Sequence, residues 1–268
     1  MGCYAFREAG REETFSQHVL GIVKCYEGMW EYEGFKKKVS RIHNLSELVV
    51  GDLLLLSAVI HDLGKAKKKL QDMCSVECTS FRQHYITSAQ LALKLGYAIS
   101  ELNLSPDNIE EKLKKLIGDG GLDDNRLKHL DSGDAYLLIV VLPVLLHHYA
   151  QVVSESSILD GLDSAETYLE IHEDCATELT TIINEVSKSI KSGVCQKILG
   201  ELRKVAIEKG VRLSIINNKI LDESKSYEYV PERFIIEAAT GLLNLCDSRV
   251  ASRNRRRTAQ QDSPSNEK

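Results

Sequence analysis

Apolar residues recur at helical spacing along most of the chain, with polar residues between them. Between residues 13 and 30, one face of the expected helix collects Phe15, His18, Val19, Ile22 and Val23. Similar patterns predict amphipathic helices over residues 163–190 and 194–209. Because His18 lies on the apolar face of the first helix, its side chain is expected to point into the core.

Two segments are apolar on almost every side, which predicts helices that are buried all round. One covers residues 49–62, and Gly64 follows it as a helix end. The other covers residues 134–150, whose length favours a helix over a strand. Pro143 is expected to kink this second helix one turn before the histidine pair near its end.

Two further helices carry metal-competent side chains. One is expected to open at His84 and to run to about Glu101. The other begins near Pro231, a residue suited to a first helical turn, and runs to about Ala251. On its inner face Asp247 shares a stripe with Ile236, Thr240, Leu243 and Val250.

The remaining segments are more polar. Residues 102–133 predict a peripheral excursion, and residues 258–268 predict a disordered polar tail. Residues 211–222 partly alternate around an Asn-Asn pair, which predicts a small β-hairpin. The sequence as a whole therefore predicts an all-α fold, with one helical domain over residues 1–257.

The overall composition suits a globular protein without membrane segments. The chain has 268 residues, 43% of them hydrophobic, and no window reaches the roughly 18–20 apolar residues of a membrane span. The N-terminus lacks the apolar core of a signal peptide, so a cytoplasmic protein is expected. The formal net charge of −5 argues against strong non-specific nucleic-acid binding by the isolated chain.

Seven cysteines are scattered along the chain, and their odd number favours reduced thiols in a cytosolic protein. Cys74 and Cys78 form a CxxxC pair, for which a structural zinc site is the alternative. No second Cys/His pair at zinc-finger spacing accompanies it, so this alternative is the weaker one.

Metal-binding side chains gather on the inner faces and at the ends of the apolar helices. The set, which holds five of the eight histidines, is His18, His61, Asp62, His84, His147, His148 and Asp247. Imidazole and carboxylate together suit first-row metals such as Mn, Fe, Co, Ni or Zn. A structural role is expected for the other histidines, which are His43, His129 and His172.

Asp62 and Asp247 are carboxylates at inward-facing positions. A buried unpaired carboxylate is destabilising by several kcal/mol. Because the helices around them offer few basic residues, divalent cations are the expected compensation. His61 and Asp62 are adjacent at a helix end, where the backbone can turn both side chains to one side, whereas within a helix they would diverge by about 100°.

The segment HDLGK, residues 61–65, closely resembles the signature of the HD superfamily of metal-dependent phosphohydrolases. The order of the motifs, with FRQHYITSA, the HH doublet and CDSRVAS, resembles one branch, the CRISPR-associated HD nucleases of type I systems. The resemblance covers about residues 13–255. Because the chain has no GxxxxGK[ST] phosphate loop and no room for a helicase, it is similar to the stand-alone nuclease subunit of split, type I-A-like systems.

The resemblance implies two divalent metals a few ångströms apart, with Mn, Fe, Ni or Co expected and Mg as a further candidate. One metal would be held by His18, His61, Asp62 and Asp247. The other would be held by His84, His147 and His148, with Asp62 bridging as a catalytic residue. Tyr85 and Tyr149 stand where the family often has Glu and Gly, and neither position is expected to bind metal.

Four lysines follow the HD doublet, and the resemblance suggests how they meet the substrate. Lys65 is expected to act in catalysis by contacting the scissile phosphate or the leaving oxygen. Lys67, Lys68 and Lys69 are expected to follow the next phosphates as DNA-binding residues, although such a charge run also suits a solvated helix face.

The implied substrate is single-stranded DNA, cut in CRISPR interference with a separate helicase and an RNA-guided surveillance complex. Two other functions stay open. One is an HD-type phosphohydrolase of small nucleotides, which the superfamily motif permits but the histidine doublet and DSRVAS disfavour. The other is a non-catalytic scaffold, which the complete ligand set disfavours. The sequence does not decide between exonuclease and endonuclease action.

Overall fold

The computed structural model describes residues 2–75, 77–81, 83–117, 129–148, 167–214 and 233–261, with side chains up to residue 255. Most of these residues are helical, which confirms the all-α prediction. Among the described residues, no helix is both long and apolar enough to cross a membrane.

The helical elements fall into two series along the chain. The first consists of α1 (Phe15–Glu27), α2 (Trp30–His43), α3 (Glu47–Ile60), the 3₁₀ turn η1 (Leu63–Ala66), α4 (Lys68–Met73), α5 (His84–Tyr97) and the 3₁₀ turn η2 (Ser100–Leu102). The second consists of α6 (Ile109–Ile117), α8 (Ser132–Tyr136), the π turn η3 (Leu137–Val141), α9 (Leu142–Leu146), α11 (Glu173–Ser189), α12 (Gly193–Glu208) and α14 (Arg233–Gln261).

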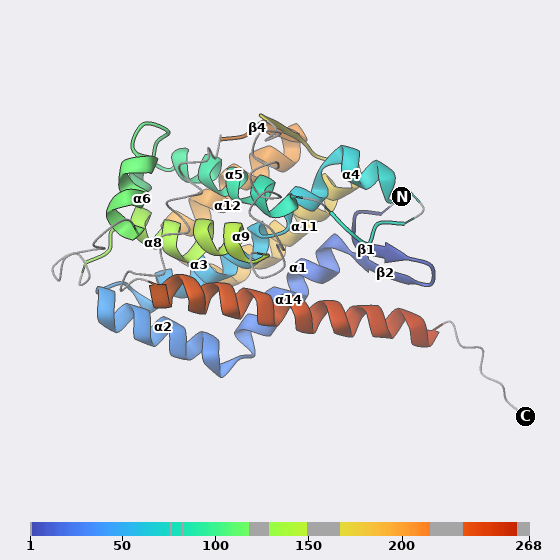
Figure 1. Ribbon diagram of the computed structural model, residues 1–268, viewed down its shortest axis with the longest axis horizontal. Coiled ribbons are helices and arrows are strands. Elements are labelled where there is room, and N and C mark those ends of the chain that lie inside the picture. Colours follow the sequence, from blue (N-terminus) through green and yellow to red (C-terminus); the bar gives the residue numbers. More distant parts are fainter. Residues whose placement is uncertain are drawn as a thin grey trace, which may run out of the picture.

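Helix α3 forms the centre of the core. Every residue from Val50 to Ile60 is buried, as expected for a helix that is apolar on all sides. Helices α1, α2 and α5 pack around α3, and α14 runs along one side of the molecule against α1 and α9 (Figure 1). The ends of several helices therefore meet in one interior region, although they are far apart in the sequence.

The apolar segment expected as one helix over residues 134–150 is interrupted by the π turn η3. The N–H of Leu142 donates to the carbonyl of Leu137, five residues back, and Pro143 lies in the first turn of α9. Proline is tolerated at such a position because a residue in the first turn of a helix does not have to donate a backbone N–H to the helix. The kink expected at Pro143 is thus seen as a π turn directly before this residue. Residues 149–150 of the expected helix lie outside the described part of the chain.

Two antiparallel strand pairs accompany the helices. Strands β1 (Tyr4–Glu8) and β2 (Arg11–Thr14) form an N-terminal hairpin that the apolar pattern did not predict. Strand β3 (Tyr168–Glu170) pairs with β4 (Gly210–Arg212). A strand is thus present near residue 211, but its partner lies before α11, and residues 215–222 of the expected hairpin are outside the described residues.

Several boundaries differ from those predicted. The helix expected from residue 163 begins only at Glu173, because β3 precedes it. Helix α14 continues to Gln261 instead of ending near Ala251, so the first residues of the expected tail are helical, and residues 262–268 are not described. Helix α2 was not predicted. The expected excursion over residues 102–133 contains α6, which buries Ile109, Leu113 and Leu116.

Six of the seven cysteines form disulfides, so the expectation of reduced thiols is wrong. The bonds are Cys3–Cys175, Cys25–Cys246 and Cys74–Cys78. The zinc alternative for the CxxxC pair is wrong for the same reason, and Cys195 is a buried free thiol. The Cys25–Cys246 bond joins α1 to α14, which carry two residues of the predicted metal set.

We expect one titratable thiol, from Cys195, in protein that is purified and denatured without reductant, and seven after reduction. Colorimetric thiol titration in guanidinium measures both numbers. Seven thiols before reduction would contradict the disulfides.

Candidate metal centre

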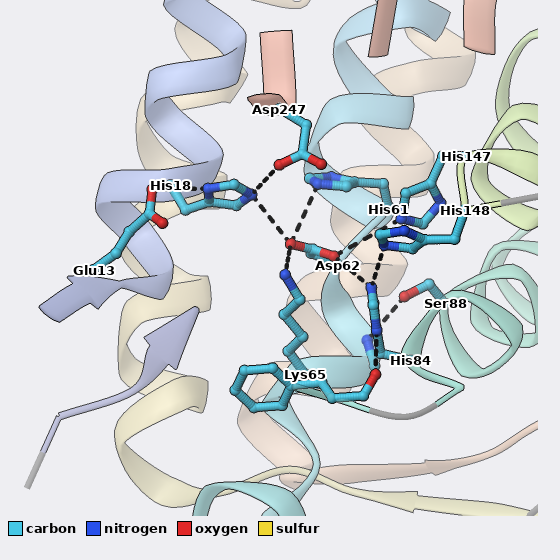
Figure 2. Close-up of polar contacts among 12 residues, drawn as sticks. Glu13, His18, His61, Asp62, Lys65, His84, Ser88, His147, His148 and Asp247 are labelled. Atoms are coloured by element: carbon cyan, nitrogen blue, oxygen red, sulfur yellow. Dashed lines mark hydrogen bonds and ion pairs between the residues drawn. The ribbon is translucent and has the colours of Figure 1, made fainter. Parts of the chain in front are cut away.

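All seven side chains of the predicted metal set lie together in the interior (Figure 2). They form two donor groups, and the ligand atoms within each group lie within 4.8 Å of one another. The first group consists of His18, His61 and Asp247, and the second of Asp62, His84, His147 and His148. The elements that supply them are α1, the end of α3, α5, the end of α9, and α14. Metal binding by these groups stays a prediction.

Asp62 lies between the two groups, because its carboxylate oxygens point to different sides. Oδ2 lies 3.1 Å from Nε2 of His18 and 3.4 Å from Nε2 of His61. Oδ1 lies 3.0 Å from Nε2 of His84 and 4.0 Å from Nε2 of His147. A carboxylate that bridges two cations needs this arrangement, with one oxygen toward each donor group.

Asp247 and His148 complete the two groups. Oδ1 of Asp247 lies 3.2 Å from Nε2 of His18, and Nε2 of His148 lies 3.0 Å from Nε2 of His84. The Asp247 side chain is 24% exposed, whereas that of Asp62 is 2% exposed. The centre is therefore sealed around Asp62 and open to solvent on the side of Asp247.

The backbone explains why the HDLGK segment places two successive side chains at one point. Helix α3 ends at Ile60, and Asp62 leaves the helical conformation with φ −108° and ψ 7°. The N–H of Gly64 donates to Oγ of Ser88 at 2.9 Å, and a Cβ on Gly64 would lie 2.2 Å from the carbonyl oxygen of His84. Only a glycine allows α5 to start this close, and that approach brings His84 beside Asp62.

Three histidines of the centre are held by the carbonyl three residues earlier in the chain. The Nδ1 atoms of His61, His84 and His147 lie 2.9, 2.5 and 2.6 Å from the carbonyl oxygens of Ala58, Phe81 and Val144. Because a carbonyl only accepts, each Nδ1 carries the proton, and Nε2 of the neutral ring then has the lone pair. Those lone pairs face the middle of the site, as metal ligation requires.

His18 is held differently, by the carboxylate of Glu13. Its Nδ1 lies 2.9 Å from Oε1 of Glu13, which also accepts from Nδ2 of Asn254 at 2.8 Å, and Glu13 is completely buried. A carboxylate behind a histidine orients the ring and makes it a stronger ligand. The sequence analysis missed Glu13, because it lies in the polar segment REET before α1 and nothing in that pattern marks it as buried.

Several buried polar atoms at the centre form no hydrogen bond of good geometry with the described residues, although some lie at ion-pair distance from a neighbour, as Oδ2 of Asp62 does from Lys65. They are Nε2 of His18, His61 and His147 and both oxygens of Asp62. The atoms face one another at contact distance, and such groups are strongly destabilising when they stay unsatisfied. Divalent cations between them would satisfy all five, so the donor set fits two metal ions.

The pKa values of two residues favour the forms that bind cations. Burial raises the pKa of Asp62, but the His61 ring, when no metal is bound and it takes up a proton, and the ammonium of Lys65 outweigh it and hold the pKa well below its usual value. Burial, together with the nearby charge of His148, holds the pKa of His147 well below its usual value. An ionised carboxylate and a neutral imidazole are the required ligand states.

The four lysines after the doublet do not share one environment. Nζ of Lys65 lies 2.6 Å from Oδ2 of Asp62, and Lys65 lines a cleft of about 570 Å³ that opens onto the centre. Lys67, Lys68 and Lys69 do not line this cleft, and Lys68 pairs with Glu170 on β3 at 2.9 Å. Lys65 lies beside Asp62 and lines the cleft, whereas the geometry gives no support to the other three lysines as a phosphate track.

The other histidines lie outside the cluster. His43 is buried and stacks on Phe234, with 5.9 Å between the ring centroids, and His172 accepts from the N–H of Asp174 at the start of α11. Tyr85 does lie at the centre, with its ring centroid 5.8 Å from that of His148. Tyr149 lies outside the described residues.

Replacement of Glu13 by Gln is expected to weaken divalent-metal binding by about 10- to 100-fold, because an amide holds the His18 ring less firmly than a carboxylate. Isothermal titration with Mn²⁺ measures the affinity. Glu12→Gln is the matched control, since Glu12 is half-exposed and pairs with Arg7 outside the centre. Unchanged affinity in the Glu13 variant, with the fold retained, would contradict the role given to this carboxylate.

No protein-family model matches the chain, and a search of curated proteins finds no matching sequence.

Proposed function

We propose that the chain is a metal-dependent nuclease that hydrolyses phosphodiester bonds of single-stranded DNA with two divalent cations. The observation that carries the proposal is the position of Asp62, which presents one oxygen to each of two donor groups. Many phosphatases and nucleases hydrolyse phosphate esters with two metal ions held close together. The resemblance of HDLGK to the HD phosphohydrolase signature agrees with this chemistry.

The residues of the chain have distinct tasks in this proposal. His18, His61 and Asp247 would hold one cation, and His84, His147 and His148 the other, with Asp62 shared. When bound, the two cations would provide an activated water and neutralise charge on the phosphate. The backbone carbonyls and Glu13 keep the imidazole rings oriented, and Lys65 is placed to bind a phosphate oxygen next to Asp62.

The donor set also limits the choice of metal. Five imidazoles and two carboxylates suit Mn, Fe, Co or Ni better than Mg, which prefers oxygen ligands and retains several waters. We therefore expect a transition metal in the active enzyme, with Mg²⁺ as a weaker substitute.

The proposal includes partners. With a net charge of −5, the chain lacks the excess of positive charge that would hold DNA strongly by itself. A separate helicase and an RNA-guided complex would deliver the single strand, as in the CRISPR systems whose nuclease the sequence resembles. Such a nuclease would be cytoplasmic. The three disulfides are unusual for that compartment, because stable disulfides in intracellular proteins are known mainly from hyperthermophiles.

Replacement of Asp62 by Ala or Asn is expected to reduce cleavage of a labelled single-stranded oligonucleotide by roughly a thousandfold or more, because both donor groups lose their shared ligand. Gel assays with Mn²⁺, Ni²⁺, Co²⁺ and Mg²⁺ measure the rate. Asp72→Ala is the matched control, since Asp72 is an exposed aspartate on α4.

Circular dichroism of each variant shows whether the fold is retained. The nuclease assignment is wrong if the wild-type protein cuts no oligonucleotide with any of these metals. Rapid hydrolysis of free nucleotides in the same assays would instead support the small-nucleotide phosphohydrolase.

A further inference from the structure

The cleft at the metal centre continues along helix α14 beyond the last ligand. One wall of the cleft consists of Asp247, Ser248, Ala251, Ser252 and Arg255, which follow one another on a single face of the helix. From Asp247 to Arg255 the helix rises by about 12 Å. This wall is longer than one phosphate group, so the cleft has room for more of the substrate than the bond that is broken.

Another part of the cleft lining is held in place by contacts outside the cleft. It includes Thr79, Ser80 and Phe81, in the segment that follows the Cys74–Cys78 disulfide. Cys78 forms two backbone hydrogen bonds with Arg7 on β1, at 3.1 and 2.8 Å. Nη1 of Arg7 also donates to the carbonyls of residues 74 and 75. Two parts of the cleft lining therefore have fixed positions, which suits a preformed binding site.

The charges along the cleft favour an anionic chain. Among the described residues that line it, the only carboxylate is that of Asp247, the proposed metal ligand, and Lys65 and Arg255 are positively charged. The lining also includes the hydroxyl groups of Thr79, Ser80, Ser248 and Ser252, and hydroxyl groups donate readily to phosphate oxygens. Phe81 and Tyr85 add aromatic surface on which a base can stack.

Arg255 is oriented before any substrate arrives. Its guanidinium lies 4.1 Å from the centroid of the Phe6 ring, and its Nε lies 3.6 Å from Oε2 of Glu13. A guanidinium that is already held in place loses little freedom when it binds a phosphate. These contacts keep the positive charge at the far end of the cleft.

We propose that Ser248, Ser252 and Arg255 form a phosphate-binding subsite for the backbone of a single-stranded polynucleotide, beyond the phosphate that reacts. This inference rests on the proposed nuclease function and deepens it, because it requires a substrate longer than one nucleotide. It also replaces the expected track along Lys67, Lys68 and Lys69 with a path along α14.

Replacement of Arg255 by Gln tests the subsite. We expect the kcat/KM for a short single-stranded oligonucleotide to fall roughly tenfold relative to that for bis(4-nitrophenyl) phosphate, since a charged hydrogen bond is lost only with the longer substrate. In the inactive Asp62→Asn background, fluorescence anisotropy should show weaker oligonucleotide binding. The slope of log affinity against log salt should become shallower by about 0.7.

Two further variants separate the subsite from general effects. Arg253→Gln removes the same charge from an exposed position of α14 outside the cleft and is expected to change neither quantity. Ser252→Glu places a negative charge in the cleft at an exposed position and is expected to weaken oligonucleotide binding more than Ser252→Gln does.

The subsite is wrong if Arg255→Gln lowers both activities equally, or if Arg253→Gln has the same effect as Arg255→Gln. It is also wrong if oligonucleotide binding keeps its salt dependence in the Arg255 variant. The wild-type protein tests the nuclease proposal separately, through cleavage of the oligonucleotide itself. Failure of the subsite is therefore distinguishable from failure of the proposed function.

Discussion

The centre is organised around the buried carboxylate of Asp62, which lies among the imidazole rings of four helical elements. A carboxylate at 2% exposure is tolerated only where positive charge compensates it. Lys65 supplies part of that positive charge, with its Nζ 2.6 Å from Oδ2 of Asp62. In His61, His84 and His147 the Nδ1 atom donates to a backbone carbonyl, so the Nε2 atom that faces Asp62 presents a lone pair in the neutral ring and supplies no proton. The arrangement is consistent with a protein that folds around cations.

The fold supports this centre through contacts that lie outside it. The disulfide between Cys25 and Cys246 joins α1 to α14 at the residue next to Asp247. Gly64 lets the start of α5 approach the end of α3, and Glu13 links His18 to Asn254 near the end of α14. Each contact fixes the distance between two elements that supply ligands, so the geometry of the centre depends on residues that bind no metal.

Much of the helical architecture was predictable from the sequence, because the apolar face of α1 and the fully apolar α3 leave strong periodic signals. The convergence of the seven side chains was expected from their inward positions and from the resemblance to a known family. Glu13 and the disulfides were not predictable. Burial of Glu13 depends on tertiary contacts with Asn254 and His18, and pairing of cysteines as distant as Cys3 and Cys175 leaves no local pattern.

The surface around the centre changes how the basic residues are interpreted. Among the lysines that follow the His61-Asp62 doublet, Lys67, Lys68 and Lys69 were expected to bind successive phosphates, but only Lys65 lines the cleft. The residues that extend the cleft come from α14, about 190 positions later in the chain.

The metal content of protein dialysed against Mn²⁺, measured by mass spectrometry, tests the proposed metal centre most directly. If both donor groups bind metal, the protein should retain two ions per chain, one for each group. Protein that keeps its fold but retains less than one ion would show that the two groups do not form a metal centre.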